Sequence, residues 1–380
     1  MPQGRARRIL HLAVFSILAG SCASVVHADG PTATRAYFPD RRWDAVSAAD
    51  AGLAGAGLAT DPASSFYANP ALALEGAKAV RVSGLLAQPS RDDLRASTTD
   101  YQDGSGFPAI GEAGARLRFK GLGVTAYFAQ PHYEHQETRF VGIDPGTGAV
   151  TGDPFLRNNA FTSATRYGGL GASVRLANGL LLGAAGEAVF LVERYSSTPV
   201  QPGIPADTFA VDQKKVALGG ALGAAYSAGG LVTIGASYHR AGSVKYDGGG
   251  SDDPPALALV GVRVGRSAGS SAYAGARFLA KRDVDLAEPT GTPRTASARS
   301  EYAVGYGYLD PGGFWAFRIG GGVSPRPDDG ALKLSRFGVS IGAGTEGARV
   351  SLAYAHTSEK RDSGRASSRN LIVASVELAP

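Results

Sequence analysis

The chain has 380 residues, of which 53 are glycine and 44% are hydrophobic, and its mean hydropathy is −0.05. This apolar content argues against disorder, while no apolar run beyond the first thirty residues is long enough for a membrane-spanning helix. A single cysteine excludes a disulfide framework and a cysteine-based zinc site. Three of the 38 basic residues lie in the first eight positions, so the rest carries a net charge of only +2, which gives no support for a nucleic-acid partner.

Residues 1–28 are predicted to be a signal peptide. Three arginines precede an apolar stretch at 9–20, and residues 26–28 fit the small-x-small pattern of a signal-peptidase site. We therefore expect export and cleavage after Ala28. The alternative, in which Cys22 accepts a lipid, lacks the leucine usually found three residues before such a cysteine.

Residues 29–77 show no alternation and are expected to form a compact plug. Residues 43–59 are rich in small side chains, which suit an element packed in a confined space. Asp61-Pro62 and Asn69-Pro70 read as turns or helix starts, because Asp and Asn bind neighbouring backbone amides and proline fixes φ for a first turn.

From residue 78 onward the chain alternates between apolar and small or polar positions, the period of a β-strand. In residues 336–342, for example, Phe337, Val339 and Ile341 share one face. Fourteen strands are predicted, an even number within the range of outer-membrane barrels. The expected strands are 78–88, 110–120, 122–133, 162–177, 180–195, 212–227, 231–245, 255–267, 271–283, 298–310, 314–325, 333–344, 348–359 and 369–379.

The connections between these strands alternate strictly between short and long. Turns such as 177–179 and 227–230 are short, whereas links such as 134–161 and 196–211 are long and polar. Membrane barrels have short periplasmic turns and longer external loops. Since unpaired amides are costly in hydrocarbon, the spanning sheet must close. The predicted fold class is all-β: a transmembrane antiparallel β-barrel of about 14 strands over residues 78–380, with the small N-terminal plug inside the lumen.

Alternation also assigns side chains to the inside of the barrel. The inward arginines make the lumen basic against few acids such as Glu187, and would favour an anionic group; alternatively they pair with Asp44, Asp50 and Asp61 of the plug. Inward leucines would line an apolar pocket. The candidate ligand-binding residues are Arg81, Arg116, Arg118, Arg175, Arg263, Arg318, Arg336, Leu85, Leu181 and Leu259.

Glycine and aromatic residues have expected places as well. Inward glycines would make room for whatever fills the lumen, or would merely permit strand coiling. Aromatic residues near strand ends are expected at the membrane interfaces. The glycines are Gly219, Gly223, Gly235, Gly261, Gly305, Gly307 and Gly320, and the aromatic residues are Tyr127, Tyr226, Tyr238, Tyr308, Phe314 and Trp315.

Catalytic, metal and cofactor sites are not predicted. A His-Ser pair on lumen faces, for instance His239 near Ser237, could form a lipase-like site, but such pairs arise often by chance on alternating strands. His132, Glu134 and His135 lie in an expected external loop, where exposed residues are commoner than metal ligands. No cofactor motif is present, because Gly55-Ala56-Gly57 lacks the preceding strand and following Lys of a nucleotide loop.

The plug segment resembles a known family. Residues 51–57, then 61–64 and 67–71, look like the start of the FadL/TodX outer-membrane transporters of hydrophobic compounds. The residues that carry the resemblance are Gly52, Gly55, Gly57, Asp61, Pro62, Tyr67, Asn69, Pro70 and Ala71. The resemblance implies a fourteen-stranded barrel with an N-terminal hatch. The chain differs in being shorter than the best-known transporters and in lacking a C-terminal aromatic residue.

The expected function is uptake across the bacterial outer membrane of hydrophobic or amphipathic small molecules, such as long-chain fatty acids or aromatic hydrocarbons. By resemblance, the ligand would diffuse passively past the plug and leave through the wall or into the periplasm. Outer-membrane lipids and the ligand are the expected partners, and a closed barrel is expected as a monomer. Two alternatives stay open: a barrel that supports a secretion or surface-attachment complex, and an outer-membrane lipid hydrolase.

Overall fold

The computed structural model describes most of the chain after the predicted leader. The expected cleavage site after Ala28, together with Cys22 and Asp44, lies outside the described residues. The described residues are 45–89, 100–103, 108–140, 157–176, 179–199, 209–246, 250–266, 268–285, 294–296, 298–325, 333–345, 347–360 and 366–379.

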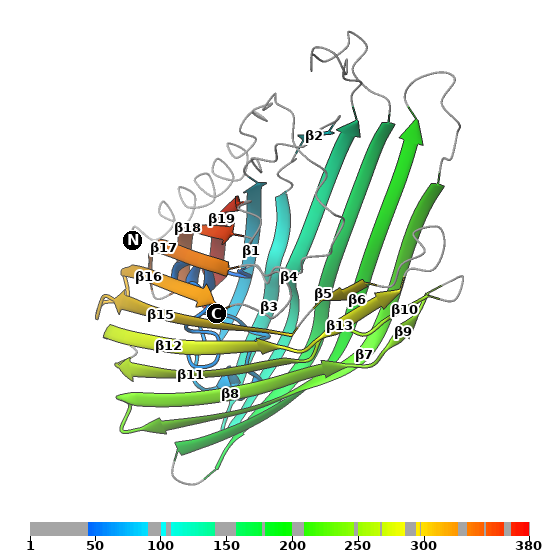
Figure 1. The fold of residues 1–380 in the computed structure, drawn as a ribbon. Coiled ribbons are helices and arrows are strands. Elements are labelled where there is room, and N and C mark those ends of the chain that lie inside the picture. Colours follow the sequence, from blue (N-terminus) through cyan, green and yellow to red (C-terminus); the bar gives the residue numbers. More distant parts are fainter. Residues whose placement is uncertain are drawn as a thin grey trace, which may run out of the picture.

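Fourteen antiparallel strands form a closed barrel, as predicted (Figure 1). The ring closes where the first and last strands pair, from Val80↔Leu378 to Pro89↔Arg369. In order around the wall, the strands are β1 (Ala79–Pro89), β3 (Pro108–Phe119), β4 (Leu122–Phe140), β5 (Arg157–Arg175), β6 (Leu180–Pro199), β7 (Phe209–Ala228), β8 (Val232–Ala241), β11 (Leu257–Gly265), β12 (Gly269–Leu279), β15 (Arg299–Leu309), β16 (Trp315–Ser324), β17 (Lys333–Thr345), β18 (Ala348–Lys360) and β19 (Ala366–Leu378).

The strands differ in length more than the sequence predicts. Strands β5 to β7 have 19 or 20 residues and β8 has 10, so the hairpins of β4 to β7 rise above the rest of the wall (Figure 1). The links expected at 134–161 and 196–211 are therefore partly strand. Strand pairing outside the apolar band of the wall needs no apolar face, so hydropathic alternation does not indicate it. Short strands also form where links were expected: β2 (Asp100–Asp103) on the edge of β4, and a separate sheet of β9 (Val244–Lys245), β10 (Ser251–Asp252), β13 (Arg282–Asp285) and β14 (Arg294–Ala296).

The outer face of the wall is apolar. Leu170, Leu218 and Leu222 on β5 and β7 are 65% to 79% exposed, and Tyr238 and Trp315 are exposed near strand ends as expected for interface aromatics. Tyr127 was placed with these aromatics, and that placement is wrong: it is buried, because its position on β4 faces the lumen. Among the described residues, no helix is long and apolar enough to cross a membrane.

The plug segment, residues 45–77, lies inside the ring of strands (blue in Figure 1). It contains helix α2 (Ala48–Gly52), capped by Ser47, and the 3-10 helix η1 (Pro70–Leu74). Asn69 caps η1 by accepting a hydrogen bond from the Ala71 amide at 3.1 Å, which confirms the reading of Asn69-Pro70 as a helix start. Asp61 likewise accepts from the Ala63 amide and fixes a turn.

Inward glycines let the plug backbone touch the wall. A Cβ on Gly338 would collide with the Ala51 carbonyl, one on Gly320 with Leu53, and one on Gly235 with the Ala59 carbonyl. Other wall glycines that meet plug atoms are Gly111, Gly114, Gly123, Gly183, Gly223, Gly261, Gly275 and Gly305. We call this set the glycine ring. Of the seven inward glycines expected, Gly219 and Gly307 instead meet neighbouring wall residues. The excess of glycine is thus largely explained by packing around the plug.

A bulky residue in the glycine ring is expected to destabilise the barrel with its plug. Gly338→Val should lower the free energy of unfolding by at least the ~1–3 kcal/mol typical of overpacking, because the added side chain would meet backbone atoms. Gly186→Val is the matched control, since a Cβ there meets nothing within 4 Å. Thermal unfolding in detergent, followed by heat-modifiable migration on gels, measures the difference. Equal melting of the two variants would contradict the packing role.

Candidate functional site

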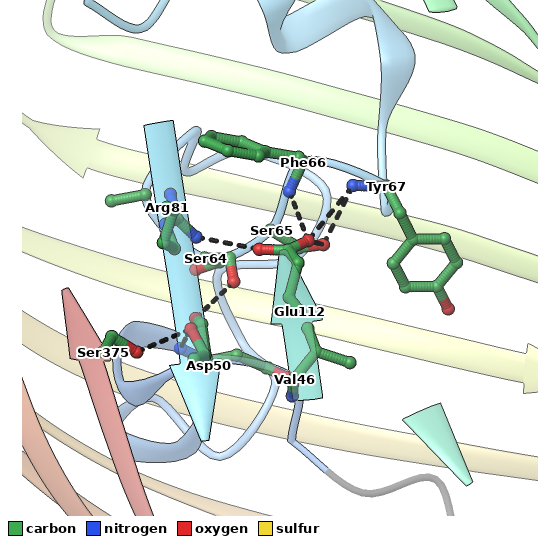
Figure 2. Close-up of polar contacts among 12 residues, drawn as sticks. Val46, Asp50, Ser64, Ser65, Phe66, Tyr67, Arg81, Glu112 and Ser375 are labelled. Atoms are coloured by element: carbon green, nitrogen blue, oxygen red, sulfur yellow. Dashed lines mark hydrogen bonds and ion pairs between the residues drawn. The ribbon is translucent and has the colours of Figure 1, made fainter. Parts of the chain in front are cut away.

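Glu112 on β3 holds the plug from within the wall. Its Oε1 accepts hydrogen bonds from the Ser65 hydroxyl at 2.6 Å and the Phe66 amide at 2.7 Å, and Arg81 lies 3.1 Å from its Oε2 (Figure 2). The Glu112 side chain is fully buried. The carboxylate therefore replaces the water that the backbone of this turn would otherwise need.

Two arginines enclose the plug beside Glu112. Arg81 also pairs with Glu377 at 3.0 Å, while Arg116 donates to the Pro62 carbonyl at 3.0 Å and to the Ala77 carbonyl at 2.9 Å. Both guanidinium groups stack on Phe66, at 4.4 and 5.1 Å from the ring centroid. The two residues point inward as predicted, and their contacts are with the plug and with wall acids.

A second basic cluster surrounds Glu301 on β15. Arg277 is in direct contact with its carboxylate, Arg299 lies 2.8 Å from it and Arg336 lies 3.8 Å from it. Between this cluster and plug residue Gly55 is a cavity of about 10 Å³, close to the space one water needs. Gly55 has a φ of +91°, a conformation that favours glycine. Three cations around one carboxylate leave this region net positive.

The other predicted arginines lie apart from these clusters. Arg318 approaches Asp61 of the plug at 3.8 Å, and Arg263 donates to Thr233 at 3.0 Å. Arg175 is partly exposed and pairs with Glu75 at 3.3 Å, and Arg118 is exposed. The arginines thus form two inner clusters, two separate inner contacts at Arg263 and Arg318, and two exposed positions at Arg118 and Arg175, and they do not converge on one site.

The predicted leucines are buried in three separate places. Leu85 packs with Ala48 of the plug, Leu181 packs with Leu72 and Leu74 of η1, and Leu259 belongs to the largest cluster. That cluster, which we call the upper apolar cluster, contains Val189, Leu191, Leu257, Leu259, Leu279, Val244 and Tyr246 together with plug residues. These leucines line the lumen as expected, but they do not share one pocket.

The motif from Tyr67 to Ala71 is held by two side chains of β8, one of which is supported from β6, and by a backbone carbonyl of β7. The Ala68 carbonyl accepts from the Ser237 hydroxyl at 2.6 Å and from His239 Nε2 at 2.9 Å. His239 Nδ1 lies 3.1 Å from Glu187 Oε1, which also accepts from the Tyr127 hydroxyl at 2.6 Å. Asn69 donates to the Ala59 and Ala224 carbonyls.

This geometry does not resemble a hydrolase centre. Ser237 and His239 both donate to one backbone carbonyl, which is not the serine-to-histidine hydrogen bond that activates a nucleophile. In the part of the chain that the structure describes, no group of three or more His, Cys, Asp or Glu side chains is placed to hold a metal ion. His132, Glu134 and His135 lie within β4, not in the loop expected for them.

Sequence reasoning missed the acids that organise the site. Glu112, Glu301 and Glu377 were not assigned inward positions, although Glu112 is in step with the inward residues Gly114 and Arg116. The two-residue period of the strand was therefore sufficient to place Glu112 on the inner face. No local signal marks Tyr167, whose ring stacks on Tyr67 with centroids 5.4 Å apart.

Comparison with solved structures finds similar barrels, whereas no protein-family model and no curated protein matches. A Pseudomonas aeruginosa FadL homologue has a TM-score of 0.62 at 15% identity, covering 88% of this chain and 98% of that one. The Ralstonia pickettii toluene transporter TbuX has a TM-score of 0.61 at 16% identity, with 89% and 99% covered. The P. putida toluene transporter TodX has a TM-score of 0.59 at 13% identity, also with 89% and 99% covered.

These likenesses establish the fold. The chain is a fourteen-stranded barrel of the architecture seen in FadL and TodX structures, which confirms at that level the resemblance read from residues 51–71.

Removing the Glu112 carboxylate should loosen the plug. Glu112→Ala leaves Arg81 buried without this partner and the Phe66 amide unpaired, and breaking a buried pair costs about 3–5 kcal/mol. The control is Glu75→Ala, whose pair with the partly exposed Arg175 is worth at most about 1 kcal/mol. Limited proteolysis of residues 60–70 in folded barrel is the measurement. Equal resistance in both variants would show that Glu112 does not hold the plug.

Asp50 in α2 should make the plug less stable as pH rises. Burial raises the pKa of Asp50 from 3.8 to about 6, against the lowering effects of Arg277 and the Val46 amide. Between those two values the native state binds a proton that the unfolded state has lost, so stability falls with rising pH and the loss is complete above about pH 6. The loss amounts to about 3 kcal/mol.

Asp50→Asn should remove this pH dependence, because its amide oxygen can still accept from the Val46 amide. Between pH 4 and 7, the melting temperature of the variant should rise relative to that of the native chain as the pH increases. Asp310→Asn, in the partly exposed β15–β16 turn, is the control. A difference that is constant across this range would refute the assignment.

Proposed function

We propose that this chain is an outer-membrane channel that admits hydrophobic or amphipathic small molecules down their gradient. The observation that carries the proposal is a break in the wall between β3 and β4. Their ladder runs from Phe119↔Leu122 to Glu112↔Ala129 among the described residues, although β3 continues to Pro108 and β4 to Phe140. A barrel that served only as a wall would gain from pairing these strands throughout.

The local sequence accounts for the break. The β4–β5 register shifts between Ala129 and His132, where Gln130-Pro131 interrupts the strand, and proline has no amide hydrogen to donate. On β3, the register with β1 shifts at Gly111, which lies against the Val46 carbonyl of the plug. The break thus meets the plug at a point where Leu85 and plug alanines make an apolar surface. An apolar molecule could pass sideways there into the bilayer without entering water.

The inner surface supports the same proposal. The upper apolar cluster would receive a hydrocarbon, and the basic cluster around Glu301 would favour an anionic group. Proteins of the same fold include the toluene transporters TbuX and TodX and the CymD monoaromatic hydrocarbon channel. For this chain, the substrate, the role of the plug as a gate and the outer-membrane location are parts of the proposal.

A second candidate, a barrel that docks a secretion or attachment complex, has two observations in its favour. The plug backbone packs directly on the glycine ring, and the hairpins of β4 to β7 extend the external surface. A docking barrel could keep its lumen filled by the plug at all times. A channel requires the plug to move so that the lumen opens. Uptake measurements separate the two.

The test is uptake of labelled long-chain fatty acid and of labelled toluene by cells with and without the gene. Replacing Gln130→Thr together with Pro131→Val should extend the β3–β4 ladder and lower uptake several-fold. Pro311→Ala, in the β15–β16 turn, is the control and should leave uptake unchanged. Full uptake by the double variant would contradict the lateral route. Equal uptake by cells without the gene would contradict the transport function itself.

A further inference from the structure

Glu187 lies on the inner face of β6 between Ala185 and Val189, which both belong to the upper apolar cluster. Toward one end of that strand, Leu181 packs on η1. The Ala68 carbonyl of the plug is bound by His239 and Ser237. Tyr67 and Ala68 themselves belong to the upper apolar cluster, and residues 71–74 of the same segment pack with Leu181, so the segment takes part in both apolar regions of the interior.

The hydrogen-bond pattern fixes one proton on His239. A carbonyl oxygen only accepts, so His239 Nε2, 2.9 Å from the Ala68 carbonyl, must carry a hydrogen. Nδ1 faces Glu187 Oε1 at 3.1 Å, and this oxygen already accepts from Tyr127. The other oxygen of Glu187 is buried without a hydrogen-bond partner among the described residues. Both ring nitrogens can be satisfied as donors only when the imidazole is protonated.

Among the described residues, the other titratable side chains that contact His239 or Glu187 are phenols. Tyr127 comes from β4, Tyr167 from β5, and the Tyr67 ring of the plug lies 5.2 Å from the imidazole. Burial raises the pKa of Tyr67 well above its usual value, with further contributions from Tyr167 and Glu187, and Arg277 and Asp50 also act on it. Phenols ordinarily titrate near pH 10, and imidazole near 6.5.

Loss of the Nδ1 proton would weaken the hold on Ala68. A neutral imidazole that keeps its hydrogen on Nε2 presents a lone pair to the Glu187 carboxylate, and two acceptors at 3.1 Å repel. Moving the hydrogen to Nδ1 restores that contact but leaves the Ala68 carbonyl without its histidine donor. Either outcome costs one of the two hydrogen bonds made by the protonated ring.

We propose that His239 and Glu187 form a pH-dependent latch on the plug, closed while the imidazole is protonated and released when it loses its proton. Release removes one of the two side-chain donors to Ala68 and so loosens the segment from Tyr67 to Ala71, while Ser237, Asn69, Glu112 and the glycine ring keep their contacts. The inference rests on the proposed function in one respect: the loosened segment, which packs in both apolar regions, would let the transported molecule pass between them.

Hydrogen exchange tests the latch in the purified full barrel, in detergent and without any substrate. After correction for the intrinsic pH dependence of exchange, the peptide covering residues 66–74 should lose about tenfold of its protection between pH 5.5 and 8.5. His239→Gln keeps a donor toward Ala68 but cannot titrate, so its protection should change with pH only as far as Asp50 contributes. Glu187→Gln should move the midpoint to lower pH, because a neutral amide no longer favours the protonated ring.

Ser237→Ala is the matched control, since it removes the other donor to Ala68 and leaves the histidine in place. It should exchange faster at every pH and keep the pH dependence. Heat-modifiable migration on gels shows which variants are folded barrels. Corrected exchange that is independent of pH in the native chain, or an unchanged pH dependence in folded His239→Gln, would overturn the latch. A confirmed latch in a chain that moves no substrate would overturn the transport function alone.

Discussion

The structure depends on direct contact between the backbone of the plug and the backbone of the wall. A barrel of fourteen strands has an interior too wide to fill with its own side chains, and the plug fills it with small residues such as Ala51, Ala56 and Ala59. Several parts of the plug meet a strand at a glycine, and at these points no side chain separates the two backbones. This close approach explains why residues 43–59 are rich in small side chains and why the strands contain so much glycine.

Backbone that is buried in this way needs hydrogen-bond partners, and the wall supplies them as a few charged side chains. Glu112 accepts from the plug, Arg81 and Arg116 donate to the Pro62 carbonyl, and Ser237 and His239 donate to Ala68. The polar interior is therefore a set of local anchors, each placed where the plug chain turns. Such anchors release one at a time more readily than a continuous sheet would.

Strand period and connection length were sufficient to predict the barrel, its strand number and the inward direction of Arg81, Arg116 and Arg336. The same rules could not predict what these arginines bind, because the partner carbonyls of Pro62 and Ala77 belong to a segment without periodicity. Alternation also failed at the far ends of β4 to β7, which continue without an apolar face. Tyr127 was misplaced because its aromatic ring suits both a lipid interface and a packed interior, and only the register of β4 decides between them.

The glycine ring has a consequence for how this fold tolerates change. Contacts made by main-chain atoms constrain only the positions that must be glycine. The outward positions can then be occupied by any residue that suits an apolar surface. Two barrels can then keep the same shape while retaining few identical residues, as the 13% to 16% identity to TodX, the FadL homologue and TbuX illustrates. In such a protein the fold depends more on which positions are glycine than on which side chains the outer face carries.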